Sequence, residues 1–121
     1  MVKLLYGANI LIDYLNGIVP AQLELDKAAN PMISVITWME VMAGTSAAEE
    51  GDIRAWLETF QLIRLDSKIA DVAVSIRKLR RIKLPDAIVW ASAKAHSAVL
   101  VSRNVKDFPP QEADVRVPYL L

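Results

Sequence analysis

Three carboxylates lie beside apolar segments, where a charged side chain is less expected than on an open surface: Glu40, Asp86 and Asp107. Several hard oxygen ligands brought together would bind Mg²⁺ or Mn²⁺, which can activate water and stabilise phosphoryl transfer. Other common hydrolytic devices are missing, because the sequence has no cysteine, one histidine, no G-x-S-x-G motif and no P-loop lysine motif. Metal-assisted chemistry is what remains if the chain is an enzyme.

Each of these acids also has a purely structural interpretation. Thr37 followed by Glu40 fits a capping box at a helix start. Asp86 follows a proline at the start of an apolar helix, where a carboxylate gains about 0.3 to 1 kcal/mol from the helix dipole. Asp107 precedes a Phe-Pro-Pro segment typical of a turn. Taken alone, therefore, none of the three identifies a site.

A basic stretch runs directly into Asp86 and could hold an RNA backbone beside the acids. Its charged members are Arg77, Lys78, Arg80, Arg81 and Lys83. The alternative is a solvated helix end, where cations are favoured. Because 14 Lys and Arg balance 14 Asp and Glu, any nucleic-acid binding must come from such local clustering.

The tryptophans are given no catalytic role, and a general base is the less favoured interpretation of His96. Trp38, Trp56 and Trp90 could stack on bases, but tryptophans on apolar helical faces more often belong to a core or a partner interface. His96 is interpreted as a helix-end cation or a surface residue.

Alternating apolar patterns predict the elements that must position these residues. Strands are expected over residues 2–6, 32–36, 61–65, 98–101 and 115–117, and helices over 9–16, 20–29, 37–44, 46–60, 67–83 and 85–96. Asn9 and Thr37 are the expected caps of the first and third helices, and Ser46 with Glu49 forms a second capping box. Strands alternating with helices predict an α/β fold, in which three layers are built around a mostly parallel sheet and sites lie at the carboxyl ends of the strands.

Length and composition predict one domain over residues 1–121. The chain has 121 residues, 54% of them apolar, which suffices for one buried core. The lack of cysteine fits a reducing compartment. No apolar run approaches the roughly 18 residues of a membrane span, and the first residues do not lead into a signal-peptide core. A cytoplasmic protein is expected.

Four ordered segments of the chain resemble the PIN-domain family over nearly its full length. They are NILIDYL at 9–15, ITWMEV at 36–41, KLPDAI at 83–88 and VSRNVKDF at 101–108. The length is also similar to that of stand-alone VapC ribonuclease toxins of type II toxin-antitoxin systems. The resemblance implies a Mg²⁺- or Mn²⁺-dependent endoribonuclease, commonly held inactive by a partner antitoxin, and we expect a homodimer.

The resemblance also implies roles for individual residues. Glu40 and Asp86 match two of the metal-binding acids, while the fourth position falls in the loop 102–108, where Asn104 or Asp107 could serve. Ser102 would orient a ligand or a water molecule. We therefore predict Glu40, Asp86 and Asp107 as metal ligands, these three with Ser102 and Asn104 as the catalytic set, and Arg103 with the basic stretch as RNA-binding residues.

The first family motif departs from the pattern. The family usually reads Asp-Thr-Asn or Asp-Ser-Asn where this chain reads Gly7-Ala8-Asn9. Losing a carboxylate should lower both metal affinity and water activation. Asp13, one helical turn after Asn9, could substitute, but a solvated or helix-pairing Asp13 is the favoured interpretation. Glycine also readily ends a strand at a tight strand-to-helix turn.

Three hypotheses follow for the function. The first is a metal-dependent ribonuclease. The second, motivated by Gly7, is a catalytically weakened PIN-like protein that acts by binding an antitoxin or RNA. The third, which draws on the apolar composition and the tryptophans, is an antitoxin-bound structural dimer without RNA contact.

Overall fold

A five-stranded sheet forms the centre of the molecule in the computed structural model, which describes residues 2–121. The strand order is β3-β2-β1-β4-β5, and each neighbouring pair is parallel. The strands are β1 (Leu4–Tyr6), β2 (Met32–Ser34), β3 (Gln61–Ile63), β4 (Val99–Val101) and β5 (Val115–Arg116). The predicted parallel α/β sheet is confirmed.

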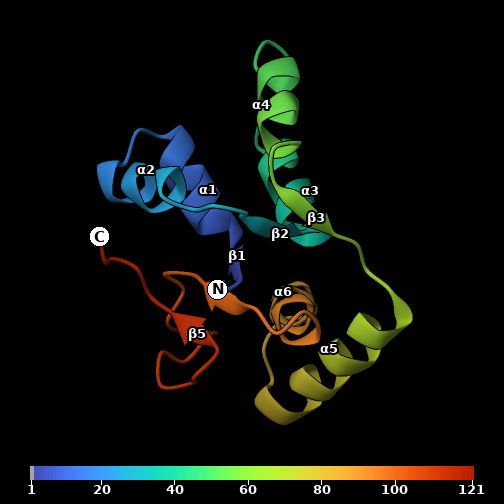
Figure 1. The fold of residues 1–121 in the computed structure, drawn as a ribbon. Helices are drawn as coiled ribbons and strands as arrows, with labels where there is room; N and C mark the ends of the chain where they lie inside the picture. The colour runs from blue at the N-terminus through green and yellow to red at the C-terminus, as the bar shows by residue number, and fades with distance from the viewer. Residues whose placement is uncertain (1) are drawn as a thin grey trace.

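Helices lie on both sides of this sheet (Figure 1). They are α1 (Ala8–Leu15), α2 (Val19–Asp26), α3 (Val35–Ala43), α4 (Glu50–Leu57), α5 (Ser67–Arg80) and α6 (Leu84–Ala95). Figure 1 shows α5 and α6 together on one side, α1 and α2 on the other, and α3 and α4 extending away as an arm. Within residues 2–121, none of these helices has the length and apolar character needed to cross a membrane.

Alternate strand residues build two separate apolar clusters. Leu5 and Leu100 belong to the cluster that packs against α5 and α6, whereas their neighbours Tyr6 and Val101 belong to the cluster under α1 to α4. Successive side chains of a strand point to opposite faces of a sheet, so both faces are buried. The three-layer arrangement is therefore confirmed.

The second strand is shorter than predicted, and this changes the interpretation of Glu40. β2 ends at Ser34, whose hydroxyl accepts a hydrogen bond from the Ile36 N–H at 3.1 Å and so caps α3. Thr37 lies inside α3 with a fully buried side chain and no capping role. The predicted capping box of Thr37 and Glu40 is wrong, because Ser34, three residues before the predicted helix start, is the N-cap of α3.

Two other predicted caps also differ. Gly7 occupies the N-cap of α1, and Asn9 lies in its first turn, where its amide donates to the Ser102 hydroxyl instead. Glu49 does accept hydrogen bonds from the hydroxyl and the N–H of Ser46, at 2.9 and 3.4 Å, but α4 begins only at Glu50. The second capping-box pattern therefore closes a turn before the helix.

The strand order reverses between β1 and β4. From β1 the chain continues outward through β2 and β3, then crosses to the other side of β1 to form β4 and β5. Gly7 directly follows β1 and Ser102 directly follows β4, and the Gly7 N–H bonds to the Val101 carbonyl at 2.9 Å. In open parallel sheets, the carboxyl ends at such a reversal are where ligands bind.

Candidate active site

Three acids lie around this edge of the sheet. Glu40 is on α3, Asp86 is in the first turn of α6, and Asp107 is in the loop after β4. Burial raises the pKa of Asp86, and the charge of Asp107 raises it further, whereas the charge of Lys83 partly offsets this rise. Asp86 and Asp107 are also close enough to share a hydrogen bond. Burial, and then the charge of Asp86, raise the pKa of Glu40. The three predicted acids are thus electrostatically linked through Asp86.

Two of the three acids are placed to share a divalent cation. Within residues 2–121, no three acidic or histidine side chains converge closely enough to enclose an ion on their own. Asp86 and Asp107 are nevertheless paired carboxyls that repel when both are ionised. Mg²⁺ commonly binds through one or two carboxylates and keeps several waters. Asp86 and Asp107 are therefore the carboxylates that would hold such an ion, and the nearby charge of Glu40 would favour its binding.

The loop after β4 is held by side-chain hydrogen bonds. The Ser102 hydroxyl is 1% exposed and accepts from the Asn9 amide at 3.2 Å and from the Asn104 N–H at 3.1 Å. The Asn104 amide in turn donates to an Asp107 carboxylate oxygen at 3.0 Å. Asp107 is the member of this loop that contacts Asp86, and Asn104 supports it. This favours Asp107 over Asn104 for the fourth position.

Asp13 is buried, so the prediction of a solvated Asp13 is wrong. Its carboxylate is 4% exposed and receives Nε and Nη2 of Arg103 at 2.6 and 2.9 Å and the Tyr119 hydroxyl at 2.8 Å. The hydrogen bonds from Arg103 keep the pKa of Asp13 below its usual value. Both oxygens are occupied, so Asp13 is not free to replace the missing first ligand.

Gly7 is not required by the local backbone. Its φ of −75° and ψ of 162° are open to any residue. A Cβ at this position would meet Ser102 Oγ at 3.5 Å and the Val101 carbonyl at 3.6 Å, which is ordinary van der Waals contact. The scaffold can therefore accept a side chain here, and that side chain would start beside Ser102.

The predicted RNA-binding residues differ in their surroundings. Lys83 is exposed and close enough to Asp86 to lower its pKa, whereas Arg80 is paired with Glu112 and lies 4.8 Å above the Trp90 ring. Arg103 is engaged with Asp13. The remaining members, Arg77, Lys78 and Arg81, are exposed near the end of α5. Contact with RNA stays a prediction for all of them.

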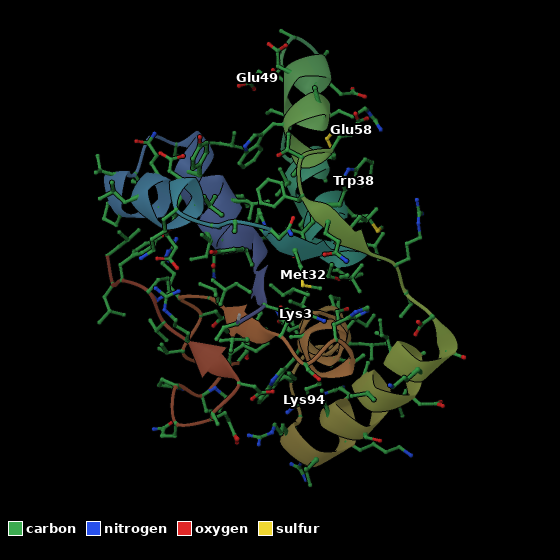
Figure 2. All side chains as sticks on the ribbon, in the orientation of Figure 1. Lys3, Met32, Trp38, Glu49, Glu58 and Lys94 are labelled. Atoms are coloured by element: carbon green, nitrogen blue, oxygen red, sulfur yellow. The ribbon has the colours of Figure 1, made fainter. Side chains whose placement is uncertain are left out.

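His96 and a cavity of about 650 Å³ lie at the opposite edge of the sheet. Lys3 and Met32, both labelled in Figure 2, line this cavity near the starts of β1 and β2, and Gln61 lines it at the start of β3. His96 is the C-cap of α6, as expected for a helix-end residue. Because the acids gather at the other edge, this cavity is not part of their site.

The tryptophans belong mainly to the packing of the helices. Trp90, on α6, is fully buried and donates its indole N–H to Asp114. Trp56 stacks on Tyr14 with ring centroids 5.0 Å apart, which joins the α3–α4 arm to α1. Sequence analysis predicted no role for Tyr119 and did not predict that Asp13 pairs with Arg103. Their only signal was a charged residue inside the apolar run of α1.

Comparisons with known proteins agree with this architecture. A search of curated proteins gives no match. A chain from a toxin-antitoxin complex of Klebsiella pneumoniae is 39% identical, with a TM-score of 0.93 over 98% of this chain and 100% of that one. FitAcB from Neisseria gonorrhoeae (21% identity, TM-score 0.82, 98% and 100% covered) and DNA-bound VapBC from Salmonella typhimurium (21%, 0.76, 96% of each) share the fold. Residues 8–109 match the PIN domain family, so this chain belongs to that family.

Proposed function

We propose that this chain is the toxin of a toxin-antitoxin pair and an endoribonuclease that uses Mg²⁺ or Mn²⁺. The observation that carries the proposal is the charge linkage of Glu40, Asp86 and Asp107 at the carboxyl edge of the sheet. Membership of the PIN family supports nuclease chemistry, and the 39% identical chain from a toxin-antitoxin complex supports an antitoxin partner. A homodimer and a cytoplasmic location remain predictions.

The chain's own residues would divide the work as follows. Asp86 and Asp107 hold the cation with Glu40 beside them, while Asn104 and Ser102 keep the Asp107 loop in place. When bound, a divalent cation supplies charge neutralisation at a phosphate and a nucleophilic water at neutral pH. Lys83, next to Asp86, supplies a positive charge for the RNA backbone.

Gly7 favours a second candidate function. With no carboxylate at this position, the site has one oxygen ligand fewer than the family pattern, so cation affinity is lower. A chain weakened in this way could still occupy an antitoxin or RNA through its other surfaces. This candidate and the active nuclease differ in whether the unaltered chain turns over RNA.

The deciding experiment is RNA cleavage with Mg²⁺ or Mn²⁺ by the unaltered chain, Gly7→Asp and Asp86→Asn, with EDTA as the control for contaminating nucleases. Asp71→Asn is the matched control, because Asp71 is an exposed acid on α5. We expect Gly7→Asp to cleave at least about tenfold faster, since a restored ligand worth about 1.4 kcal/mol changes a rate tenfold. We expect Asp86→Asn to abolish cleavage and Asp71→Asn to leave it unchanged.

Each result separates the candidates. Cleavage by the unaltered chain that Asp86→Asn removes supports the nuclease. Cleavage only by Gly7→Asp supports the weakened binding protein on an intact scaffold. Cleavage that EDTA abolishes but Asp86→Asn leaves unchanged would show that the proposed site is wrong, whereas cleavage that survives EDTA in every variant would come from a contaminating nuclease.

A further inference from the structure

The cavity at the amino edge of the sheet has the size of a small-molecule site. Its volume is about 650 Å³, and pockets for small molecules commonly hold about 300 to 1,000 Å³. The starts of three strands line it, through Lys3 beside β1 and Met32 of β2, both labelled in Figure 2, and Gln61 of β3. The end of α2, the loop 28–30 that follows it, and the end of α6 complete the wall.

Most of the lining is apolar. Besides Met32, its apolar members are Val2, Leu4, Ala28, Ala29 and Pro31. Covering these side chains with an apolar ligand is favourable in proportion to the area removed from water. A ligand of this cavity therefore needs an apolar body.

One polar group of the wall lacks a partner. Tyr6 lines the cavity and is fully buried, and its hydroxyl has no hydrogen-bond partner among residues 2–121. Buried hydroxyls normally have a partner, either in the protein or in an ordered molecule bound to it. Independently of the size of the cavity, this hydroxyl points to an occupant that carries an acceptor.

The charged side chains of the lining are cationic. They belong to Lys3 and Lys27, and His96 lies beside them, whereas no aspartate or glutamate of residues 2–121 lines the cavity. Lys27 contacts Glu24 at 3.3 Å, but Glu24 is also paired with Arg116, so two cations share one carboxylate. Lys3 forms no salt bridge within the described chain. Lys3 and the Lys27 group therefore contribute about one positive charge each.

The helix ends at the cavity offset part of this charge. Lys27 is the C-cap of α2 and His96 is the C-cap of α6. Each helix C-terminus is equivalent to about half a negative charge, so the two together cancel about one of the two positive charges. What remains suits a single negative charge, and it does not suit a doubly charged group such as a phosphate monoester.

We propose that this cavity binds a small monoanion with an apolar body, of the class of aliphatic and aromatic carboxylates. The anionic group lies near Lys3, and the apolar body covers the side chains at the starts of β1 and β2. The cation assigned to Asp86 and Asp107 at the opposite edge takes no part in this binding. The inference and the proposed function can therefore fail separately.

The test is a fluorescence titration of the isolated chain with two probes at low ionic strength. Anilinonaphthalene sulfonate is an apolar monoanion, and phenylnaphthylamine is the same apolar body without the sulfonate. We expect one sulfonate probe to bind per chain and octanoate to displace it. Lys3→Gln should weaken the sulfonate probe about two- to fivefold, as for an exposed ion pair, and leave the neutral probe unchanged. Ala29→Trp should weaken both probes, because the added indole occupies the cavity wall.

Lys68→Gln and Ala47→Trp are the matched controls, because both residues are exposed and neither lines the cavity. Both should leave the binding of the two probes unchanged, and circular dichroism establishes that every variant is folded. The inference is wrong if octanoate does not displace the sulfonate probe, or if Lys3→Gln affects both probes equally or neither of them. Unchanged binding in a folded Ala29→Trp would also overturn it, since the probe would then bind elsewhere. If Ala29→Trp does not fold, the contrast between the two probes in Lys3→Gln decides alone.

Discussion

Replacing Arg103 by methionine should destabilise the protein strongly, because it leaves Asp13 charged and buried. Both oxygens of Asp13 are hydrogen-bonded, and the residue is 4% exposed. Removing one partner of a buried pair costs about 3 to 5 kcal/mol. Since the Arg103 side chain is 33% exposed and partly screened by solvent, we expect about 2 to 3 kcal/mol. For a chain of this length, Tm should fall by roughly 8 to 12 °C.

Urea unfolding followed by circular dichroism measures this loss. The matched control is Glu50→Gln, which breaks an exposed pair with Arg54 whose side chains are 47% and 53% exposed and should cost less than about 0.5 kcal/mol. Adding Asp13→Asn to Arg103→Met should recover part of the loss, because the unpaired charge is removed. The reasoning is refuted if Arg103→Met costs no more than the control, or if Asp13→Asn recovers nothing.

The same pair predicts a pH dependence of stability. Arg103 lowers the pKa of Asp13 in the folded protein, so the unfolded chain holds that proton more tightly. The contribution to stability is complete above the unfolded pKa of about 3.9 and is lost as the pH falls through the lower folded value. The difference in unfolding free energy between the unaltered chain and Arg103→Met should therefore narrow below about pH 4.

Four further predictions concern Tyr6, Asp114 and the binding of Mn²⁺. The Tyr6 hydroxyl is buried without a hydrogen-bond partner, and its pKa is raised to about 12 by burial and then by the charge of Glu24. Tyr6→Phe should therefore leave the free energy of unfolding in urea unchanged or raise it by up to about 1 kcal/mol. A loss of stability would mean that the hydroxyl has a partner. Asp114 accepts hydrogen bonds from the Trp90 indole at 3.0 Å and from the Lys94 ammonium at 2.8 Å. Asp114→Asn should therefore lower the free energy of unfolding by about 1 to 2 kcal/mol and shift the tryptophan fluorescence emission. An unchanged Tm and emission would count against these hydrogen bonds. Mn²⁺ at ten times its Kd should stabilise the chain by about 1.4 kcal/mol. Because the pKa of Asp86 is raised and the ion needs the ionised form, Mn²⁺ affinity should fall as the pH drops through that value; a flat affinity profile from pH 7.5 to 4.5 would contradict this.

Much of the fold could be predicted from periodicity alone. Strands such as β1 and β4 are short apolar runs, buried on both faces, and α6 shows helical spacing, so element types and order were correct. The predicted start of α3 was wrong because two nearby residues could each serve as its N-cap. Ser34 and Thr37 are both good N-caps, and only the packing of α3 against the sheet decides between them.

The site could be predicted only in part. Asp86 and Asp107 are 21 residues apart, and their proximity follows from the carboxyl edge of a parallel sheet. The partner of Asp13 could not be predicted in this way. Arg103 and Tyr119 lie 90 and 106 residues away, and an isolated aspartate on a helix gives no sign of which distant side chain it meets.

The contact between Asp13 and Tyr119 also sets when the fold can be completed during synthesis. Ribosomes add about 5 to 20 residues per second, so Tyr119 follows Asp13 by roughly 5 to 20 seconds. During that time a growing chain already carries Glu40 and Asp86, but the loop with Asp107 and the strand that covers β4 come later. The segment that places Asp107, and the Tyr119 that closes over Asp13, are thus among the last parts of the chain to be made, so the three acids are brought together only at the end of synthesis.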